Sequence, residues 1–426
     1  MLKHFKRQLT SRERIETTCR HEEPDVLPID FGGGSQTGIH VGVVYRLRQA
    51  LKLDPPGTPV KVVEPYQMLG EVDEELREIF CCDCVQILGY TDFFGSRNKG
   101  WKPWTMNDGT PVLVSENFNT KPESDGRLYQ YPQGDVSAGP SAVMPAGGYY
   151  FDAIIRQEPF DEDNPNVNDN MEEFTLLSDE VLKYAQDEAA AMRKTGCAVI
   201  AGPGGTALGD IAMVPGIFLK HPKGIRDIEE WYISMAIRQD FLKELYDRQT
   251  QVALENLKLY KQAVGDNIDV IYLCGSDFGS QNGPMCSAGV LNDVYLPYYK
   301  RMTNWIHANT GWKVFKHCCG SIRPLIPGLI EAGMDILNPV QNSAADMDPR
   351  TLKDEFGDKI TFWGGGVDTQ RTLPFGTPQE VFDQVKERIR IYNKNGGFVF
   401  NTIHNTQAKV PPENFLAMLD AIKLSR

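Results

Sequence analysis

The feature that most constrains the fold is a regular alternation of helix-like and short apolar segments after Ser178. Short apolar runs that follow amphipathic runs are typical of parallel β-strands joined by helices. The predicted strands cover residues 198–201, 268–274, 313–317, 334–338, 360–363 and 398–401. The predicted helices cover residues 179–195, 228–264, 291–310, 321–332, 349–357, 378–394 and 412–424.

Two earlier apolar segments, residues 26–31 and 85–88, bring the number of predicted strands to about eight. One continuous series of βα units favours a closed (β/α)₈ TIM barrel over an open doubly wound sheet. A further helix is predicted over residues 10–20. We therefore expect an α/β protein in which residues 1–426 form a single barrel domain.

Residues 101–170 interrupt this pattern. The turn signals Asn107-Asp108-Gly109 and Ser124-Asp125-Gly126 lie beside β-rich segments at 111–114 and 127–131, which predicts hairpins. We interpret the region as a hairpin-bearing insertion within the barrel domain. Its aromatic run Tyr149-Tyr150-Phe151 offers flat apolar surface near a possible entrance, or packs the insertion on its host.

Charge narrows the classes of function. The 44 basic and 57 acidic residues give 44 − 57 = −13, which disfavours nucleic acid and anionic membranes as partners. No apolar run reaches the roughly 18–20 residues of a spanning helix, and the basic start at residues 1–7 has no apolar stretch behind it. Nine cysteines are too few for a disulfide scaffold in a chain of this length. These observations predict a cytoplasmic enzyme with reduced thiols.

Polar residues follow several predicted strands at the point where each strand ends. They are Asp277, the His317-Cys318-Cys319 run, Asn338, Asp368 and His404. In a TIM barrel the carboxyl ends of the strands form the active-site face. We therefore expect these side chains to share one rim.

The His317-Cys318-Cys319 run is the most specific of these signals. Catalytic zinc takes three nitrogen, sulfur or oxygen ligands from the protein, and alternate residues of a strand point to the same side. His317 and Cys319 therefore form a candidate metal pair, which His404 could complete across the rim. The alternative is that the cysteines are small buried hydrophobes and the histidines are hydrogen-bonded core residues.

Two other motifs are interpreted as structural. Cys81-Cys82-Asp83-Cys84 has no second ligand pair at usable spacing, so buried thiols are expected at this helix end. Gly32-Gly33-Gly34 follows a strand but fits neither the dinucleotide nor the P-loop pattern, so a turn is expected rather than a phosphate cradle. His21, His40, His221 and His307 are interpreted as surface or structural residues.

Several of these motifs together resemble the uroporphyrinogen decarboxylase-like family over nearly the whole chain. The motifs are Arg12-Glu13-Arg14-Ile15, His21 to Asp30, Asp277 to Pro284, His317 to Gly320, Gly365 to Gln370 and Val410 to Asn414. The resemblance implies a (β/α)₈ barrel and one of two activities. One branch of the family decarboxylates a tetrapyrrole without a cofactor, and the other comprises cobalamin-dependent methyltransferases with zinc bound by an H-x-C motif and a later cysteine.

The second branch fits the residues better. The decarboxylases carry an arginine-rich motif soon after the first strand, whereas this chain has no arginine between Asp30 and Arg46. A polyanionic substrate would need such cations, above all on a chain of charge −13. By likeness to the methyltransferases, His317, Cys319 and His404 would hold Zn²⁺, with His404 near the place of the later cysteine.

The expected activity is transfer of a methyl group from a small donor to the cobalt of a separate corrinoid protein. The chain has no D-x-H-x-x-G corrinoid motif, so cobalamin is expected on the partner, which docks at the barrel mouth. We assign Asp277 as general acid, or as third metal ligand in place of His404, and Gln281, Asn338 and Asp368 as substrate-binding residues. The alternatives are a metal-free decarboxylase that retains Asp277 and a non-catalytic module that binds a corrinoid protein.

Overall fold

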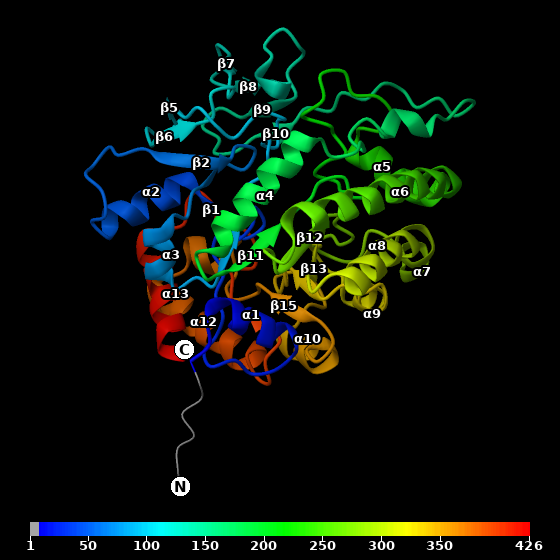
Figure 1. The fold of residues 1–426 in the computed structure, drawn as a ribbon. Helices are drawn as coiled ribbons and strands as arrows, with labels where there is room; N and C mark the ends of the chain where they lie inside the picture. The colour runs from blue at the N-terminus through cyan, green and yellow to red at the C-terminus, as the bar shows by residue number, and fades with distance from the viewer. Residues whose placement is uncertain (1–7) are drawn as a thin grey trace.

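The computed structural model describes residues 8–426, so the basic start at residues 1–7 lies outside the described residues. A seven-stranded parallel sheet is the centre of the molecule, with the order β16-β15-β14-β13-β12-β11-β4 (Figure 1). Its strands are β4 (Cys84–Gln86), β11 (Ala198–Ala201), β12 (Val270–Cys274), β13 (Lys313–His317), β14 (Ile336–Asn338), β15 (Thr361–Trp363) and β16 (Phe398–Val399).

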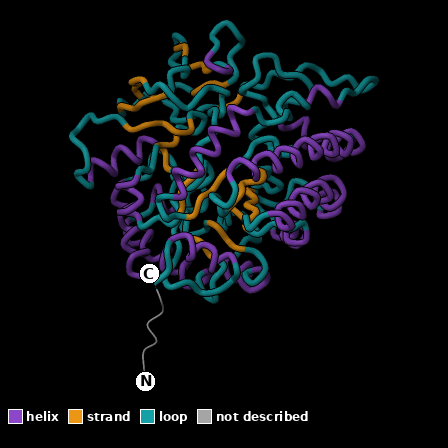
Figure 2. The backbone as a smooth tube through the Cα atoms, in the orientation of Figure 1, coloured by secondary structure: helices purple, strands orange, loops and turns teal. Residues whose placement is uncertain are grey.

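Helices connect these strands and lie around the outside of the sheet (Figure 2). This alternation confirms the predicted mixed α/β fold with parallel strands. The helices from α4 onward are α4 (Asp179–Arg193), α5 (Ile228–Ile237), α6 (Gln239–Val264), α7 (Ala288–Val290), α8 (Leu296–Asn309), α9 (Ile326–Glu331), α10 (Pro349–Phe356), α11 (Thr372–Phe375), α12 (Pro378–Tyr392) and α13 (Pro412–Ser425). A π-helical turn, η3 (Leu291–Tyr295), leads into α8, and single 3₁₀ turns are η1 (Pro132–Gly134), η2 (Val167–Asn170) and η4 (Arg323–Leu325).

Local sequence explains why α12 begins where it does. Thr377 and Glu380 form a capping box, in which each side chain accepts a hydrogen bond from the other residue's backbone N–H, and Pro378 occupies the first helical position. Val381, Val385 and Ile389 recur every four residues and are buried. The helix therefore packs one apolar face inward.

The predicted single helix over residues 228–264 is wrong at one point. Arg238 leaves the helical conformation (φ −125°, ψ 43°), so α5 ends at Ile237 and α6 begins at Gln239. The Arg238 guanidinium forms ion pairs with Glu162 and Glu230. A carboxylate distant in the sequence thus contributes to a conformation that the local pattern does not predict.

The segment around Ile29 joins the two edges of the parallel sheet. Ile29 forms a parallel bridge with Phe400 beyond β16, and the Ile29 carbonyl accepts a hydrogen bond from the Asp83 N–H beside β4 (2.7 Å). The sheet is therefore curled so that its first and last strands both contact this segment.

Two smaller antiparallel sheets adjoin the parallel sheet. One has the order β1-β3-β2-β6-β5, and the other has the order β10-β9-β8-β7. The first is formed by β1 (Ile39–His40), β2 (Val60–Glu64), β3 (Leu69–Gly70), β5 (Lys102–Thr105) and β6 (Pro111–Val114), with α2 (Val41–Ala50) and α3 (Glu74–Phe80) close in sequence. The second is formed by β7 (Thr120–Pro122), β8 (Leu128–Gln130), β9 (Ala142–Met144) and β10 (Asp152–Ala153).

The structure contains both predicted hairpins, β5–β6 and β7–β8. However, β6 pairs with β2 in register Val60↔Val112, so β5 and β6 belong to a sheet shared with earlier strands, and only β7 to β10 form a sheet within residues 101–170. Phe151 is buried against Phe94 and Phe118, and only Tyr150 of the predicted aromatic surface is 48% exposed. Packing, rather than an entrance, is therefore the role of Phe151.

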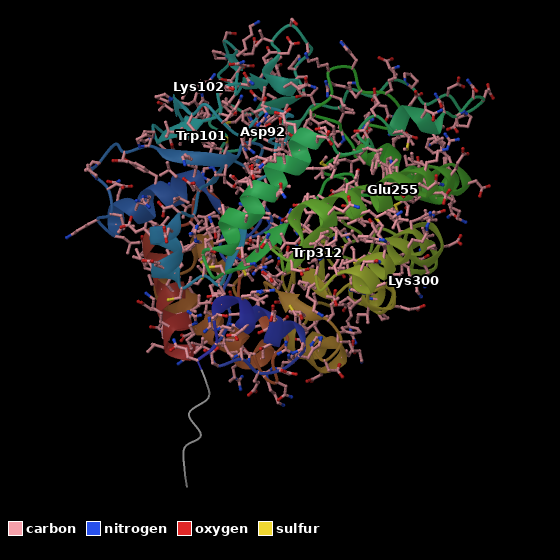
Figure 3. All side chains as sticks on the ribbon, viewed as in Figure 1. Asp92, Trp101, Lys102, Glu255, Lys300 and Trp312 are labelled. Atoms are coloured by element: carbon pink, nitrogen blue, oxygen red, sulfur yellow. The ribbon has the colours of Figure 1, made fainter. Side chains whose placement is uncertain are left out.

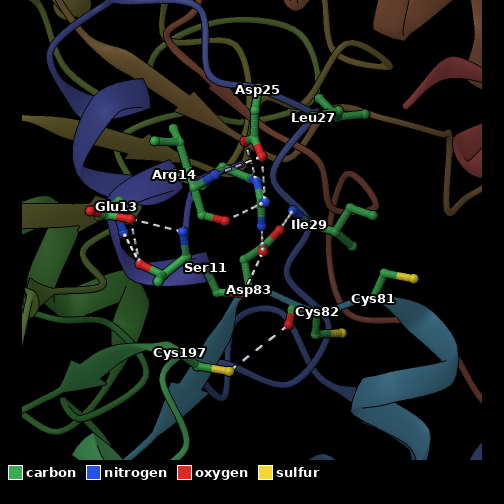
Figure 4. Close-up of polar contacts among 12 residues, drawn as sticks. Ser11, Glu13, Arg14, Asp25, Leu27, Ile29, Cys81, Cys82, Asp83 and Cys197 are labelled. Carbon is green, nitrogen blue, oxygen red and sulfur yellow. Dashed lines mark hydrogen bonds and ion pairs between the residues drawn. The ribbon is translucent and has the colours of Figure 1, made fainter. Parts of the chain in front are cut away.

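The amino ends of the strands are covered by α1 (Ser11–Cys19). Ile15 and Cys19 of this helix join Phe315 and Trp363 in the smaller of two buried clusters. Beside them, Arg14 donates hydrogen bonds to Asp25 (2.8 Å) and Asp83 (2.5 Å), and Ser11 donates to the same Asp83 oxygen (Figure 4). The guanidinium of Arg426 also pairs with Asp83 (3.1 Å). We call these five residues the base network.

The Cys81–Cys84 run lies next to this network (Figure 4). Cys82 and Cys84 are buried, as predicted, and Cys81 is half-buried at the end of α3. All nine cysteines lie in the described region and are free thiols.

Charged side chains cover the outer faces of the helices. Glu255 of α6 and Lys300 of α8 are exposed, whereas Trp101 and Lys102 lie with the smaller sheets (Figure 3). Among residues 8–426 we find no helix whose length and hydropathy would suit a membrane span.

Candidate metal centre

The carboxyl ends of neighbouring strands place the predicted site residues at one edge of the sheet. His317 is the last residue of β13, Asn338 is the last residue of β14, and Asp277 follows β12. His404 follows β16, three strands away from β13 in the sheet order. Parallel strands bring these ends together.

His317, Cys319 and His404 form one cluster. One ligand atom from each residue lies within 4.8 Å of the others, and no other group of three such side chains was found within residues 8–426. His317 Nε2 is 3.2 Å from Cys319 Sγ, and the two imidazole rings are 5.3 Å apart at 78°. The structure thus brings together the three residues that were predicted to bind zinc; the metal itself stays a prediction.

Cys318 belongs to a different environment. Its side chain is 1% exposed, and its Sγ accepts a hydrogen bond from the Phe278 N–H at 3.3 Å. Adjacent residues at a strand end point to opposite sides, which separates Cys318 from Cys319. Only the second of these two cysteines can contribute to the cluster.

Asn338 holds the His317 ring. Its Nδ2 donates to the Trp363 carbonyl (2.8 Å), which leaves Oδ1 to accept from His317 Nδ1 (2.6 Å). The proton of a neutral His317 is therefore on Nδ1, and the lone pair on Nε2 faces Cys319. Asn338 is fully buried with both polar atoms in use, so it positions His317, and its predicted contact with substrate stays a prediction.

His404 is held differently, by the backbone next to it. Its Nδ1 accepts a hydrogen bond from the Asn405 N–H at 2.8 Å. A neutral imidazole has one lone pair, so His404 cannot keep this bond and also bind a cation through that lone pair. His404 is therefore the member of the cluster that must exchange a partner when a metal binds.

Burial keeps the free cluster uncharged. It lowers the pKa of His317 to about 4 and the pKa of His404 to about 4, so both rings are neutral at pH 7. Burial, with the charge of Asp277, raises the pKa of the Cys319 thiol well above its usual value. Two neutral imidazoles and one thiol that ionises on binding are a donor set that suits Zn²⁺.

Asp277 lies directly beside the cluster. Its Oδ1 accepts from the Cys319 N–H at 2.6 Å, and its carbonyl accepts from the Tyr232 hydroxyl at 2.7 Å. Burial raises the pKa of the carboxyl group, which favours the protonated acid. This placement agrees with the general-acid role predicted for Asp277, whereas His404 completes the group of three.

Gln281 and Asp368 are placed in the loops rather than in the cluster. Gln281 accepts from Gln341 Nε2 (3.1 Å) and donates to the Ser343 carbonyl. The Asp368 carboxylate accepts from the N–H groups of Gln370 (2.7 Å) and Arg371 (3.2 Å), at the turn before α11. These contacts hold the two loops in place, and substrate binding by Gln281 and Asp368 stays a prediction.

Sequence reasoning missed Lys316. Its side chain is fully buried, and Nζ donates to the carbonyls of Ser276 (2.6 Å) and His317 (2.5 Å). Burial alone would lower its pKa, but thiol and acidic neighbours, which include Asp277, raise it, so the ammonium remains charged behind the cluster. A lysine within the apolar run 314–317 is the signal that could have revealed it.

Comparison with known proteins gives a partial family match. Residues 221–424 match the family described as uroporphyrinogen decarboxylase (URO-D). This range includes the motifs around Asp277, His317, Asp368 and Val410, so the resemblance is confirmed there. No curated protein matches the chain.

Two solved structures are similar to the chain to different degrees. A methyltransferase from Methanosarcina mazei superposes with a TM-score of 0.53 at 13% sequence identity, covering 98% of this chain and 99% of that one. At this identity the likeness shows the fold alone. An endo-beta-mannanase/endo-beta-glucanase from Prevotella bryantii gives a TM-score of 0.31 at 11% identity over 59% of this chain and 39% of that one, which carries no argument.

Proposed function

We propose that this chain, which carries a uroporphyrinogen decarboxylase family domain over residues 221–424, is a zinc-dependent methyltransferase. It would move a methyl group from a small methylated donor to the cobalt of a separate corrinoid protein. The observation that carries the proposal is the His317–Cys319–His404 cluster at the carboxyl ends of the strands. A structural neighbour that is a methyltransferase supports the same class of reaction.

We also propose how the barrel closes. Because the segment around Ile29 bonds both to the β16 side and to the β4 side, we infer that it is the eighth strand of a closed TIM barrel. The cluster then lies at the face where the active sites of such barrels are found.

The donor set indicates which leaving group is favoured. Zn²⁺ held by two neutral histidines and one thiolate would have a formal charge of 2 − 1 = +1 and would polarise an oxygen that becomes negative as the methyl group departs. We therefore propose O-demethylation, with an aryl methyl ether as donor, because a phenolate leaves more readily than an alkoxide. This choice depends on charge, since Phe151 is not available to contact a substrate ring.

The chain's own residues would act around that leaving group. Asp277 lies beside the cluster, and its raised pKa would suit it to deliver a proton to the departing oxygen. Asn338 keeps the His317 Nε2 lone pair directed at the site. The methyl group passes to the acceptor as the carbon–oxygen bond breaks, and the bonding electrons remain on the oxygen.

The family description favours a second candidate, a metal-free carboxy-lyase. Such an enzyme would retain Asp277 but would need neither zinc nor cobalamin. It does not explain why two histidines and a cysteine converge, and the chain has no arginine between Asp30 and Arg46 to bind a polycarboxylate. We therefore rank it second.

The deciding experiment is elemental analysis of freshly purified protein, followed by incubation with cob(I)alamin and a panel of methyl donors. The proposal expects near-stoichiometric zinc and transfer from 2-methoxyphenol. Zinc-free protein that decarboxylates a carboxylic acid would favour the second candidate. Transfer from methylamines or methylthiols alone would overturn the choice of donor but not the class of enzyme.

His404→Cys tests the charge argument directly. The added thiolate should retain zinc but lower the demethylation rate, because the site becomes a weaker Lewis acid. A variant that keeps its zinc and demethylates as fast as the parent protein would contradict this argument.

A further inference from the structure

Exposed apolar side chains gather on one face of α5 near the candidate metal centre. Ile233 is 39% exposed and Ile237 is 66% exposed, and the two lie one helical turn apart. Met285, from the loop after β12, is 44% exposed, and Ile155 is 45% exposed. Large aliphatic side chains on a soluble surface are usually scattered, so a cluster of them marks an interaction site.

A groove of ≈ 680 Å³ connects three of these residues. Its lining residues are five with apolar side chains or rings and two carboxylates: Ile155, Ile228, Tyr232, Ile233, Met285, Asp227 and Glu229. The Tyr232 hydroxyl donates its hydrogen bond to the Asp277 carbonyl, so the part of this side chain that lines the groove is its apolar ring. Most of the groove surface is thus apolar.

The groove adjoins the loop that supports the candidate metal centre. Tyr232 bonds to the Asp277 carbonyl, and the Asp277 carboxylate bonds to the Cys319 N–H. Met285 donates its N–H to the Phe278 carbonyl at 2.7 Å in the same loop. A molecule seated in the groove would therefore lie beside the rim without occupying the metal ligands.

Carboxylates border the apolar face. Glu229 lies one helical turn before Ile233, and Asp240 lies in the first turn of α6, just beyond the break at Arg238. The acidic loop at residues 158–163 is fixed nearby, because Glu162 pairs with Arg238 and Phe160 packs on Phe241 (5.5 Å). Within residues 8–426 the carboxylates of Glu229 and Asp163 form no ion pair, so no described residue of the chain neutralises their charge.

We propose that this groove docks a protein segment that presents apolar side chains between basic residues. A second copy of the chain is disfavoured, since both copies carry a charge of −13 and the same acidic border. A small apolar ligand would not explain the exposure of Ile237 or the carboxylates. The identification of this partner with the carrier of the methyl acceptor rests on the proposed function; the docking itself does not.

The binding test uses a synthetic 14-residue amphipathic Leu/Lys helix as probe, with a Leu/Glu helix of the same pattern as control. In physiological salt the Leu/Lys helix should bind, and Ile233→Ser/Ile237→Ser should weaken binding about tenfold. Leu176→Ser/Leu424→Ser is the matched control, because these leucines are also exposed (59% and 73%) but are not in the groove. The control should change the dissociation constant less than twofold. Thermal unfolding of both variants checks that each remains folded.

A photo-crosslinker on the probe locates the contact. Crosslinks should map to residues 155, 228–240 and 285. The proposal would be overturned if both variant pairs weakened binding equally or if the Leu/Glu helix bound equally well. Crosslinks elsewhere, or displacement of the probe by 2-methoxyphenol, would also overturn it.

Assays of methyl transfer distinguish the docking proposal from the proposed function, on which the identity of the partner rests. The probe should inhibit transfer to a corrinoid protein but leave transfer to free cob(I)alamin unchanged. Groove-dependent binding without transfer to any acceptor would overturn the proposed function and leave the docking surface intact. Transfer to the corrinoid protein that the bound probe does not affect would overturn the identification of the partner.

Discussion

The side chains at the two ends of the parallel sheet differ in how they handle charge. At the amino ends, the guanidinium of Arg14 contacts two carboxylates, Asp25 and Asp83, and Arg426 supplies a second cation to Asp83. At the carboxyl ends, His317, Cys319 and His404 face one another as uncharged groups. The charges at the base are paired, whereas the three candidate ligands at the rim are themselves uncharged; this difference agrees with a base that stabilises the fold and with our proposal that the rim binds an ion.

The largest expected effect is at the rim. Cys319→Ala should lower zinc affinity on the order of a thousandfold, because one of a few ligands that share about 10–16 kcal/mol of binding energy is removed. Cys318→Ala should keep the zinc, since its sulfur bonds to Phe278 instead. Metal content after gel filtration measures both. Loss of zinc from the Cys318 variant alone would show that the assignment of the motif is wrong.

The next effect tests the base. Arg14→Met leaves Asp25 and Asp83 without this guanidinium and should lower the free energy of unfolding by about 3–5 kcal/mol. Arg20→Met is the control, because the Arg20–Glu22 pair is exposed and such pairs contribute about 0–1 kcal/mol. Urea unfolding at pH 7 compares them. If the two variants lost similar amounts of unfolding free energy, the ion pairs of the base would be no more stabilising than an ordinary surface pair.

Asn338→Ala sharpens the comparison at the rim. Without its carbonyl oxygen the His317 ring loses its orientation, so zinc affinity should fall about 10–100-fold. Asn342→Ala should change zinc affinity little, because Asn342 Nδ2 donates to the Met347 carbonyl and the Tyr392 hydroxyl and makes no contact with the histidine. Competition with a chelator measures both affinities. Equal affinities in the two variants would contradict a positioning role for Asn338.

The smallest effect is the pH dependence of the base. Burial would raise the pKa of Asp25, but hydrogen bonds from Arg14 and from the Leu9 N–H outweigh it and lower the pKa. The stabilisation from Asp25 is therefore present above its unfolded-state pKa and is lost as the pH falls through its lower folded-state pKa. The stability difference between wild type and Arg14→Met should narrow by about 1–2 kcal/mol from pH 7 to pH 3. A difference that stays constant or widens would contradict this linkage.

The sequence predicts features that depend on local pattern. The strands at 198–201 and 313–317 occur with the predicted bounds, because short apolar runs next to helices can be recognised without knowledge of the neighbouring strands. The convergence of His317, Cys319 and His404 also follows from pattern, since parallel topology places strand ends together. The turn at Gly32–Gly34 occurs as well, with the Gly33 N–H bonded to the Asp30 carboxylate, which makes it unsuitable for a phosphate.

Features that depend on distant partners could not be predicted in this way. The break at Arg238 involves Glu162, 76 residues away, and the role of Asn338 depends on the Trp363 carbonyl of the next strand. Lys316 can be buried because the carbonyls of Ser276 and His317 accept hydrogen bonds from its ammonium group. Such contacts become visible only when the strands are paired in their register.

The rim loops are joined by amides. Gln341 donates to Gln281 in the loop after β12 and accepts from the Gly320 N–H (2.7 Å) in the loop after β13, while its own loop follows β14. Amide groups have no titratable proton and no net charge, so acid and salt weaken this connection far less than they weaken the ion pairs at the opposite end. This connection should therefore persist in salt and acid, whereas acid acts on the candidate metal centre itself through His317 and His404, whose lowered pKa values make their protonation costly in the folded protein.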